Sequence, residues 1–142
     1  MDEKRIVLDT VEMISQLMGT LESQAFELEG FSEITMSQMH YLETIGLMVN
    51  PTFGELADQL NVTRPSVSAI VKKLIQTGYL EKIQSTQDGR VYTLHLTEKG
   101  MRFNELHGEV HQMLAKSITE NLNQDEIKIL AVLLGKITKK EN

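Results

Sequence analysis

The stretch TFGELADQLNVTRPSVSAIVKKLIQTGYLEKIQSTQDGRVYTLHL, residues 52–96, decides the fold. Its first half contains two short segments with apolar residues at helical spacing, separated by Asn61 and Val62. Thr52, followed three residues later by Glu55, has the pattern of a capping box at the start of the first segment. The pattern predicts two consecutive helices joined by a tight turn.

The second of these helices is predicted to begin after Thr63, with Pro65 in its first turn, and to end before Gly78. Its buried stripe is formed by Val67, Ile70, Val71 and Leu74. Its other face carries Arg64, Ser66, Ser68, Lys72 and Lys73. Cations and hydroxyls on one helix face suit contacts with phosphates and base edges, so the pair of helices is interpreted as a DNA-binding helix-turn-helix.

A hairpin follows directly. Leu80–Gln84 and Val91–Leu96 alternate as strands do, and the polar turn Ser85–Arg90 between them has Asp88 and Gly89 at its tip. A hairpin in this place is a wing, and Arg90 just past its tip suits the negative potential of a narrow minor groove. The expected fold is therefore mainly α with a small β-hairpin wing, a winged helix-turn-helix.

Long helical patterns flank this module. Residues 4–29 carry a sustained apolar stripe, and the last helix, opened by Asn123 and Glu126, is apolar around more than half of its circumference. Another helix is expected from Thr97 to about Glu120. Since apolar terminal helices need a partner, we expect an obligate homodimer built from N- and C-terminal dimerisation helices.

The helix before the module begins at Thr35 or Ser37 and extends to about Val49, where Pro51 prevents its continuation. It has one apolar face with Leu42, Ile45 and Val49 and another with Met36 and Leu47. We therefore expect this helix to be buried between other elements.

Charge is distributed unevenly along the 142 residues, whose net charge is −6. Residues 1–62 hold two basic and eleven acidic residues, whereas residues 63–92 hold five basic and two acidic ones. The predicted DNA-binding helix and wing are thus the only positive segment, and an acidic body repels DNA elsewhere. The chain contains no cysteine, signal-peptide pattern or membrane-spanning run, so we expect a cytoplasmic protein.

The stretch resembles the MarR family of bacterial regulators in ELADQLNVTRPSVSAIVKKLIQTGYLEK, in the wing residues Asp88, Gly89 and Arg90, and in LTEKG at 96–100. The resemblance implies a single domain over 1–142, with a winged lobe at 35–100 and dimerisation helices at 1–30 and 101–142. It implies a ligand-responsive repressor that binds a pseudo-palindromic operator in double-stranded DNA. The expected DNA-binding residues are Thr63, Arg64, Pro65, Ser66, Ser68, Lys72, Lys73, Asp88 and Arg90.

His107 and His111 are four residues apart on one predicted helix face, a two-ligand spacing that zinc accepts. Together with Glu22 and His40 they match the ligands of the zinc-sensing branch of the family. Zinc is therefore the one cofactor candidate. The segments SQMHYLETIG and ELHGEVH also resemble the fatty-acid-synthesis repressors, so the same four residues are alternatively the lining of a pocket for a small apolar or acyl effector, or structural.

Two other functions are considered. An enzyme needs a nucleophile with its base, a phosphate loop or a cofactor fingerprint, and the sequence contains none of these patterns. A winged helix used only for protein contacts is disfavoured by the cations on the exposed helix face. We therefore expect a regulator and not an enzyme.

Overall fold

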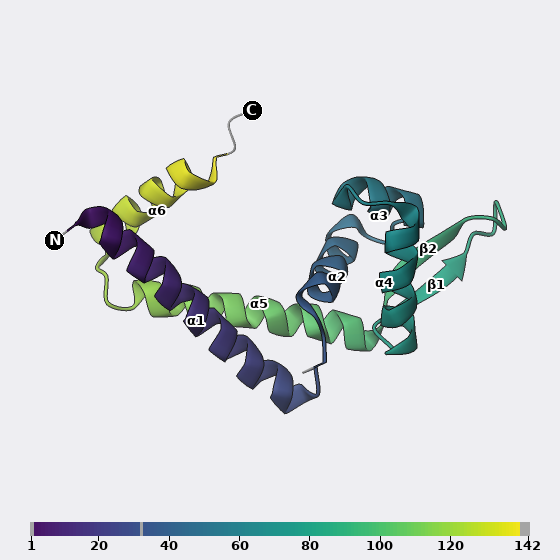
Figure 1. Cartoon of the computed structure of the whole chain (residues 1–142), viewed down its shortest axis with the longest axis horizontal. Helices are drawn as coiled ribbons and strands as arrows, with labels where there is room; N and C mark the ends of the chain where they lie inside the picture. Colours follow the sequence, from purple (N-terminus) through teal and green to yellow (C-terminus); the bar gives the residue numbers. More distant parts are fainter. Residues whose placement is uncertain (1, 32, 140–142) are drawn as a thin grey trace. The chain divides into compact units, whose positions relative to one another are not determined.

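The computed structural model describes residues 2–31 and 33–139 (Figure 1). The described elements are α1 (Glu3–Glu29), α2 (Met36–Met48), α3 (Phe53–Leu60), α4 (Arg64–Gln76), β1 (Leu80–Gln84), β2 (Tyr92–Leu96), α5 (Glu98–Thr119) and α6 (Gln124–Thr138). The mainly α fold with a β-hairpin wing is confirmed. The chain forms two compact units, one of residues 22–108 and the other of residues 1–21 and 109–142.

Hydrogen bonds at the helix starts explain where the elements begin. The Thr52 hydroxyl accepts from the Glu55 amide (3.1 Å), and the Glu55 carboxylate accepts from the Thr52 amide (3.4 Å), as the sequence predicts. The Thr63 hydroxyl accepts from the Ser66 amide (3.3 Å) and caps α4. Between α3 and α4, Asn61 adopts a left-handed conformation (φ 53°) that ends α3. These local contacts determine where α3 and α4 begin and where α3 ends.

The core of the 22–108 unit joins all its elements. Leu42, Leu56, Val67, Leu74 and Leu94 come from α2, α3, α4 and β2 and are fully buried. Burying side chains of this size stabilises a fold by roughly 1.5–3 kcal/mol each. The helix-turn-helix and the wing therefore share one core and support each other.

An aromatic cluster extends this core. Phe103 of α5 lies 5.0 Å from Phe26, 5.5 Å from Phe31 and 6.2 Å from Tyr79, measured between ring centroids. The last turn of α1 and the start of α5 therefore pack together with Tyr79, which lies between α4 and β1. Tilted and edge-on ring pairs of this kind add roughly 0.5–1.5 kcal/mol each beyond their area burial.

The wing is a two-stranded antiparallel hairpin in which Leu80 pairs with Leu96 and Gln84 with Tyr92. Its base is tied to the chain before α3, because the Leu94 amide donates to the Pro51 carbonyl (2.8 Å). The hairpin is therefore anchored at both the start of α3 and the end of α4.

The start of α5 closes on the end of α4. The Thr97 amide donates to the Tyr79 carbonyl (3.1 Å), and the Lys99 ammonium donates to the Thr77 carbonyl (2.9 Å). Gly100 fits here because a Cβ on it would lie 2.3 Å from the Tyr79 carbonyl oxygen. We call this contact of Thr97–Gly100 with Thr77–Tyr79 the α4–α5 joint.

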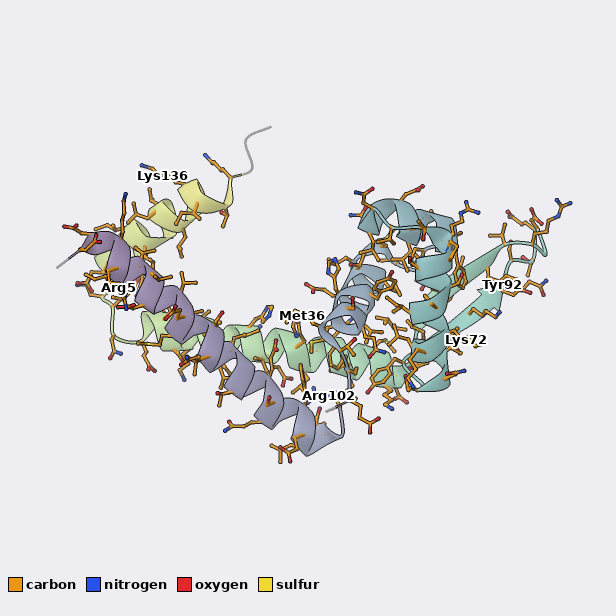
Figure 2. All side chains as sticks on the ribbon, viewed as in Figure 1. Arg5, Met36, Lys72, Tyr92, Arg102 and Lys136 are labelled. Atoms are coloured by element: carbon orange, nitrogen blue, oxygen red, sulfur yellow. The ribbon has the colours of Figure 1, made fainter. Side chains whose placement is uncertain are left out.

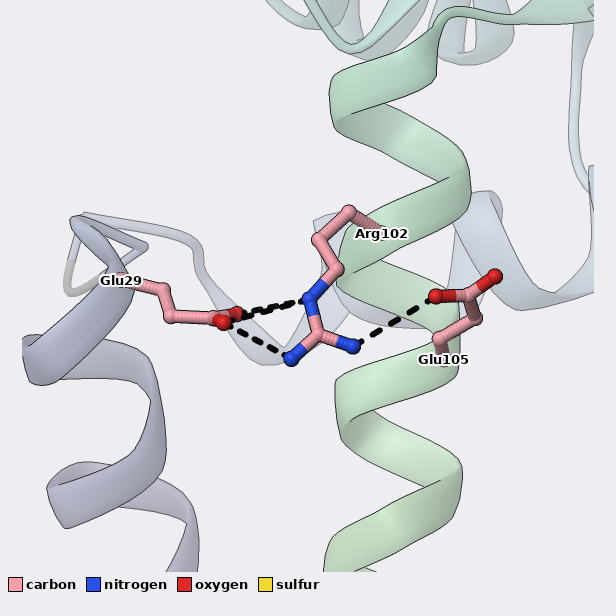
Figure 3. Close-up of polar contacts among 3 residues, drawn as sticks. All are labelled: Glu29, Arg102 and Glu105. Carbon is pink, nitrogen blue, oxygen red and sulfur yellow. Dashed lines mark hydrogen bonds and ion pairs between the residues drawn. The ribbon is translucent and has the colours of Figure 1, made fainter.

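A surface ion pair links the end of α1 to α5 (Figure 3). The Arg102 guanidinium donates to both carboxylate oxygens of Glu29, at 3.0 and 2.7 Å, and lies 3.4 Å from the Glu105 carboxylate. The Arg102 and Glu29 side chains are 40% and 35% exposed, so solvent screens the pair. Such pairs contribute at most about 1 kcal/mol, and this one chiefly sets the direction in which α1 ends.

The second helix does not behave as expected on both faces. Leu42 and Ile45 are buried, but Met36 and Leu47 are 82% and 80% exposed, and Val49 is exposed as well. Met36 is labelled in Figure 2. The expectation that α2 is buried between other elements is therefore wrong within this chain for its second apolar face and for Val49 at the end of its first. Periodicity shows that a face is apolar, but it does not show that anything in the same chain covers it.

The unit of residues 1–21 and 109–142 exposes apolar side chains. Asn123 and Glu126 form the predicted capping box at the start of α6, yet no residue of α6 is buried. Its exposed residues include Ile129, Val132, Leu133, Leu134 and Ile137, and α1 exposes Val7 and Val11. No helix in the described part of the chain is long and apolar enough to cross a membrane.

We predict that Gly100→Ala destabilises the fold by about 3 kcal/mol, because the new Cβ collides with backbone that cannot move without breaking the α4–α5 joint. Urea denaturation measures the change. Gly108→Ala on the same helix is the control, since its Cβ meets nothing within 4 Å. An unchanged unfolding midpoint in Gly100→Ala would show that the joint is not tight.

Candidate nucleic-acid interface

One face of α4 is exposed and carries cations and hydroxyls. Val67, Val71 and Leu74 point into the core. The exposed residues on α4 and at its cap are Thr63, Arg64, Pro65, Ser66, Ser68, Lys72 and Lys73. Because the buried stripe fixes the rotation of the helix, the predicted DNA-binding face is the face that solvent reaches.

The start of α4 is built from hydroxyls. The Thr63 and Ser66 hydroxyls lie 2.9 Å apart and hydrogen-bond to each other, and both are exposed. A helix N-terminus carries a partial positive charge and favours anions. This end of α4 therefore combines donors, positive potential and the Arg64 side chain.

The tip of the wing is shaped by its own side chains. The Ser85 hydroxyl accepts from the Asp88 amide (3.3 Å), the Asp88 carboxylate accepts from the Arg90 amide (3.0 Å), and the Gln84 side chain donates to the Gly89 carbonyl (2.7 Å). Asp88 thus orders the backbone of the tip, and Arg90 is exposed beside it. Through this contact Asp88 positions Arg90.

Two cavities lie where α4 meets the wing. The larger, of about 630 Å³, is lined by Ser68 and Lys72 of α4 and by Lys82 and Tyr92 of the hairpin. The Lys82 ammonium lies 4.9 Å from the centre of the Tyr92 ring. Lys72 and Tyr92 are labelled in Figure 2.

The smaller cavity, of about 320 Å³, is lined by Arg64 and Arg90 together with Gly54 and Tyr92. Two arginines far apart in the sequence therefore line one hollow. Among the described residues that line it, none is acidic.

Three residues that line these cavities are not among the predicted DNA-binding residues: Gly54, Lys82 and Tyr92. The signal for Tyr92 was present, because it shares strand parity with Leu94 and Leu96 and so lies on the face that packs toward α4. Lys82 is opposite Leu94 and shares that face. For Gly54 the only signal in the sequence was the presence of a glycine within a predicted helix.

His95 of the wing strand β2 is half-buried, and its Nε2 lies 2.8 Å from the Thr93 hydroxyl. This bond orients the ring along the strand, which makes a structural part in the wing the simpler interpretation.

Of the four residues of the candidate effector or metal set, Glu22 and His107 meet within one unit. The His107 Nδ1 lies 3.5 Å from a Glu22 carboxylate oxygen, with side chains 15% and 21% exposed. The His107 ring also stacks near Phe26 and Phe103, each with centroids at 6.3 Å. His40 is exposed on α2, and His111 is exposed one turn after His107 on α5. Their shared role stays a prediction.

Comparison with known proteins adds the following. The sequence profile of the MarR family matches residues 34–92. The HTH-type transcriptional regulator YhjH of Bacillus subtilis is 30% identical over 81 residues, which are 57% of this chain and 46% of that protein. The chain thus spans about half the length of this relative.

Solved structures are similar over almost the whole chain. FabT of Streptococcus pneumoniae in complex with DNA is 28% identical with a TM-score of 0.72, covering 96% of this chain and 94% of FabT. A variant of MarR from E. coli, complexed with operator DNA, is 25% identical with a TM-score of 0.59, covering 98% and 100% of the two chains.

Proposed function

The chain belongs to the MarR family, through the domain at residues 34–92, and from this premise we propose that it is a transcriptional regulator, not an enzyme, that binds operator DNA. The observation that carries the proposal is the exposed face of α4 next to Arg90, in the only net-positive segment of an acidic chain. The similarity to FabT and MarR structures that contain DNA supports it.

Each element of the winged unit has a proposed role in DNA binding. We propose that α4 enters the major groove, with Arg64 and Ser66 at its leading end and Thr63, Ser68, Lys72 and Lys73 toward phosphates. Arg90, ordered by Asp88, enters the minor groove. Pro65 fixes the first turn of α4 that presents these residues.

The exposed apolar residues of α6 and α1 support a homodimer. A terminal helix without a single buried residue is stabilised when a second copy of the chain covers it. A twofold-symmetric dimer presents two α4 helices to successive major grooves, about 34–36 Å apart, so its operator is pseudo-palindromic. We further propose that the protein is a repressor whose DNA affinity an effector changes.

Arg90→Ala should weaken operator binding by about 1–3 kcal/mol, since the minor-groove contact is lost.

Lys73→Ala should weaken binding to all sequences alike and reduce the dependence of log affinity on log salt by about one, because a single phosphate contact disappears. Fluorescence anisotropy with operator and scrambled duplexes at several salt concentrations measures both. Lys116→Ala, which removes an exposed cation of α5 outside the unit that contains α4 and the wing, is the control. Full affinity in Arg90→Ala would remove the wing from the interface.

Leu130→Glu combined with Leu134→Glu should convert the dimer to monomer or insoluble protein and abolish operator binding, because charge enters the proposed interface. Sedimentation velocity reports the assembly state. Lys128→Glu alters charge on the same helix at a side chain 77% exposed and should leave the dimer intact. A soluble dimer from the double variant would place the interface elsewhere.

A zinc-dependent regulator is the second candidate, favoured by the imidazole–carboxylate pair of His107 and Glu22. Both groups are ligands that zinc takes, so the pair fits the metal. His40 and His111 are the proposed further ligands, and bound zinc would supply a fixed charge that ties these residues together.

If zinc is needed, a chelator should lower operator affinity and added zinc should restore it. Glu22→Gln should bind less zinc by mass spectrometry of the native protein, while Glu12→Gln on the same helix should bind as much as the unmodified chain. Zinc-free protein with full affinity that a chelator does not change would exclude this candidate and favour the small apolar or acyl effector.

A further inference from the structure

Arg64, the first residue of α4, lies across the first turn of α3. A Cβ placed on Gly54 would be 2.7 Å from Arg64 Nη2, 3.2 Å from Cζ and 3.5 Å from Nε. Three atoms of the guanidinium group are thus at or inside contact distance of an absent side chain. The space that any other residue fills at position 54 is occupied by Arg64.

The backbone gives no other reason for this glycine. Gly54 lies within α3, and the glycines with positive φ among the described residues are Gly30 and Gly78. Glycine is less favourable than alanine in a helix. Apart from its chain neighbours and the backbone of its own helix, the three nearest heavy atoms to a Cβ at position 54 all belong to the Arg64 guanidinium.

The place where Arg64 is seated is the hollow it shares with Arg90. Both arginines line the cavity of about 320 Å³ beside Phe53 and Tyr92. Guanidinium groups bind phosphate with paired hydrogen bonds. No described residue that lines this hollow is acidic, so the hollow suits an anion.

We propose that Gly54 is a positioning residue for DNA binding: its missing side chain leaves room for the Arg64 guanidinium over the first turn of α3, in the hollow that Arg90 also lines, where Arg64 binds a phosphate of the operator backbone. The proposal rests on the proposed function and refines it. Arg64 then contributes affinity for any duplex and does not distinguish the operator from other sequences.

Gly54→Ala in the full chain tests this. The new methyl group meets only the end of a flexible side chain, so the fold is kept and the thermal midpoint should stay the same or rise. Affinity should fall roughly three- to tenfold, and equally for operator and scrambled duplexes, because a phosphate contact is displaced. The dependence of log affinity on log salt should decrease by about one.

A double-mutant cycle isolates the cause. Arg64→Ala alone should lower affinity roughly tenfold for both duplexes. In the Arg64→Ala background, Gly54→Ala should have no further effect, since there is no guanidinium left to displace. Gly108→Ala supplies the matched control for a glycine replaced in a helix, because its Cβ meets nothing within 4 Å.

The outcomes separate the two proposals. If the unmodified chain binds no duplex, the proposed function fails. If it binds and Gly54→Ala binds equally well, the positioning role is wrong. An undiminished loss from Gly54→Ala in the Arg64→Ala background would mean that position 54 itself faces DNA, and a loss confined to the operator would mean that Arg64 contacts bases; either result overturns the inference.

Discussion

The close approach of Gly100 to the Tyr79 carbonyl is the constraint on which the winged unit depends. At this joint the segment between the end of α4 and the start of β1 meets the start of α5. Gly78 turns the chain with φ +86°, and Gly100 lets the two backbones come into contact. The Thr97 amide and the Lys99 ammonium donate to carbonyls just after α4. The joint therefore orients both α4 and the wing relative to the start of α5.

Electrostatics acts on a second level, with longer range and less precision. The acidic residues before α4 repel a duplex, and the cations from Arg64 to Arg90 attract it, so the chain has one favourable orientation toward DNA despite its net charge of −6. Packing then determines which side chains are available to contact DNA. The buried stripe of α4 sets which residues are exposed, and the bond from the Arg90 amide to the Asp88 carboxylate orders the backbone from which the Arg90 side chain extends.

Much of this could be predicted from the sequence because its causes are local. Capping boxes at Thr52 and Asn123 and the turn residues of the hairpin depend on neighbours three or four positions away, and the helices and strands begin within about a residue of their predicted places. The misses have non-local causes. The exposure of Met36 and Leu47 depends on which surfaces find a partner, and the seat of Arg64 on Gly54 depends on how two helices cross. Of the candidate effector set, Glu22 and His107 lie in contact within one unit. Which ligand such a set binds depends on the chemistry of the ligand as well as on the chain, so the sequence alone does not identify it.

The residues that fit the fold worst are those that the proposed function uses. A glycine inside α3 and an α6 without buried residues each lower the stability of the isolated chain. Sequences that violate a local rule usually do so at functional sites. Here both violations have a physical partner: the Arg64 guanidinium occupies the space above Gly54, and a second copy of the chain is proposed to cover α6. A partner that covers α6 and a duplex that contacts Arg64 would each stabilise the folded chain, because each binds only the folded state.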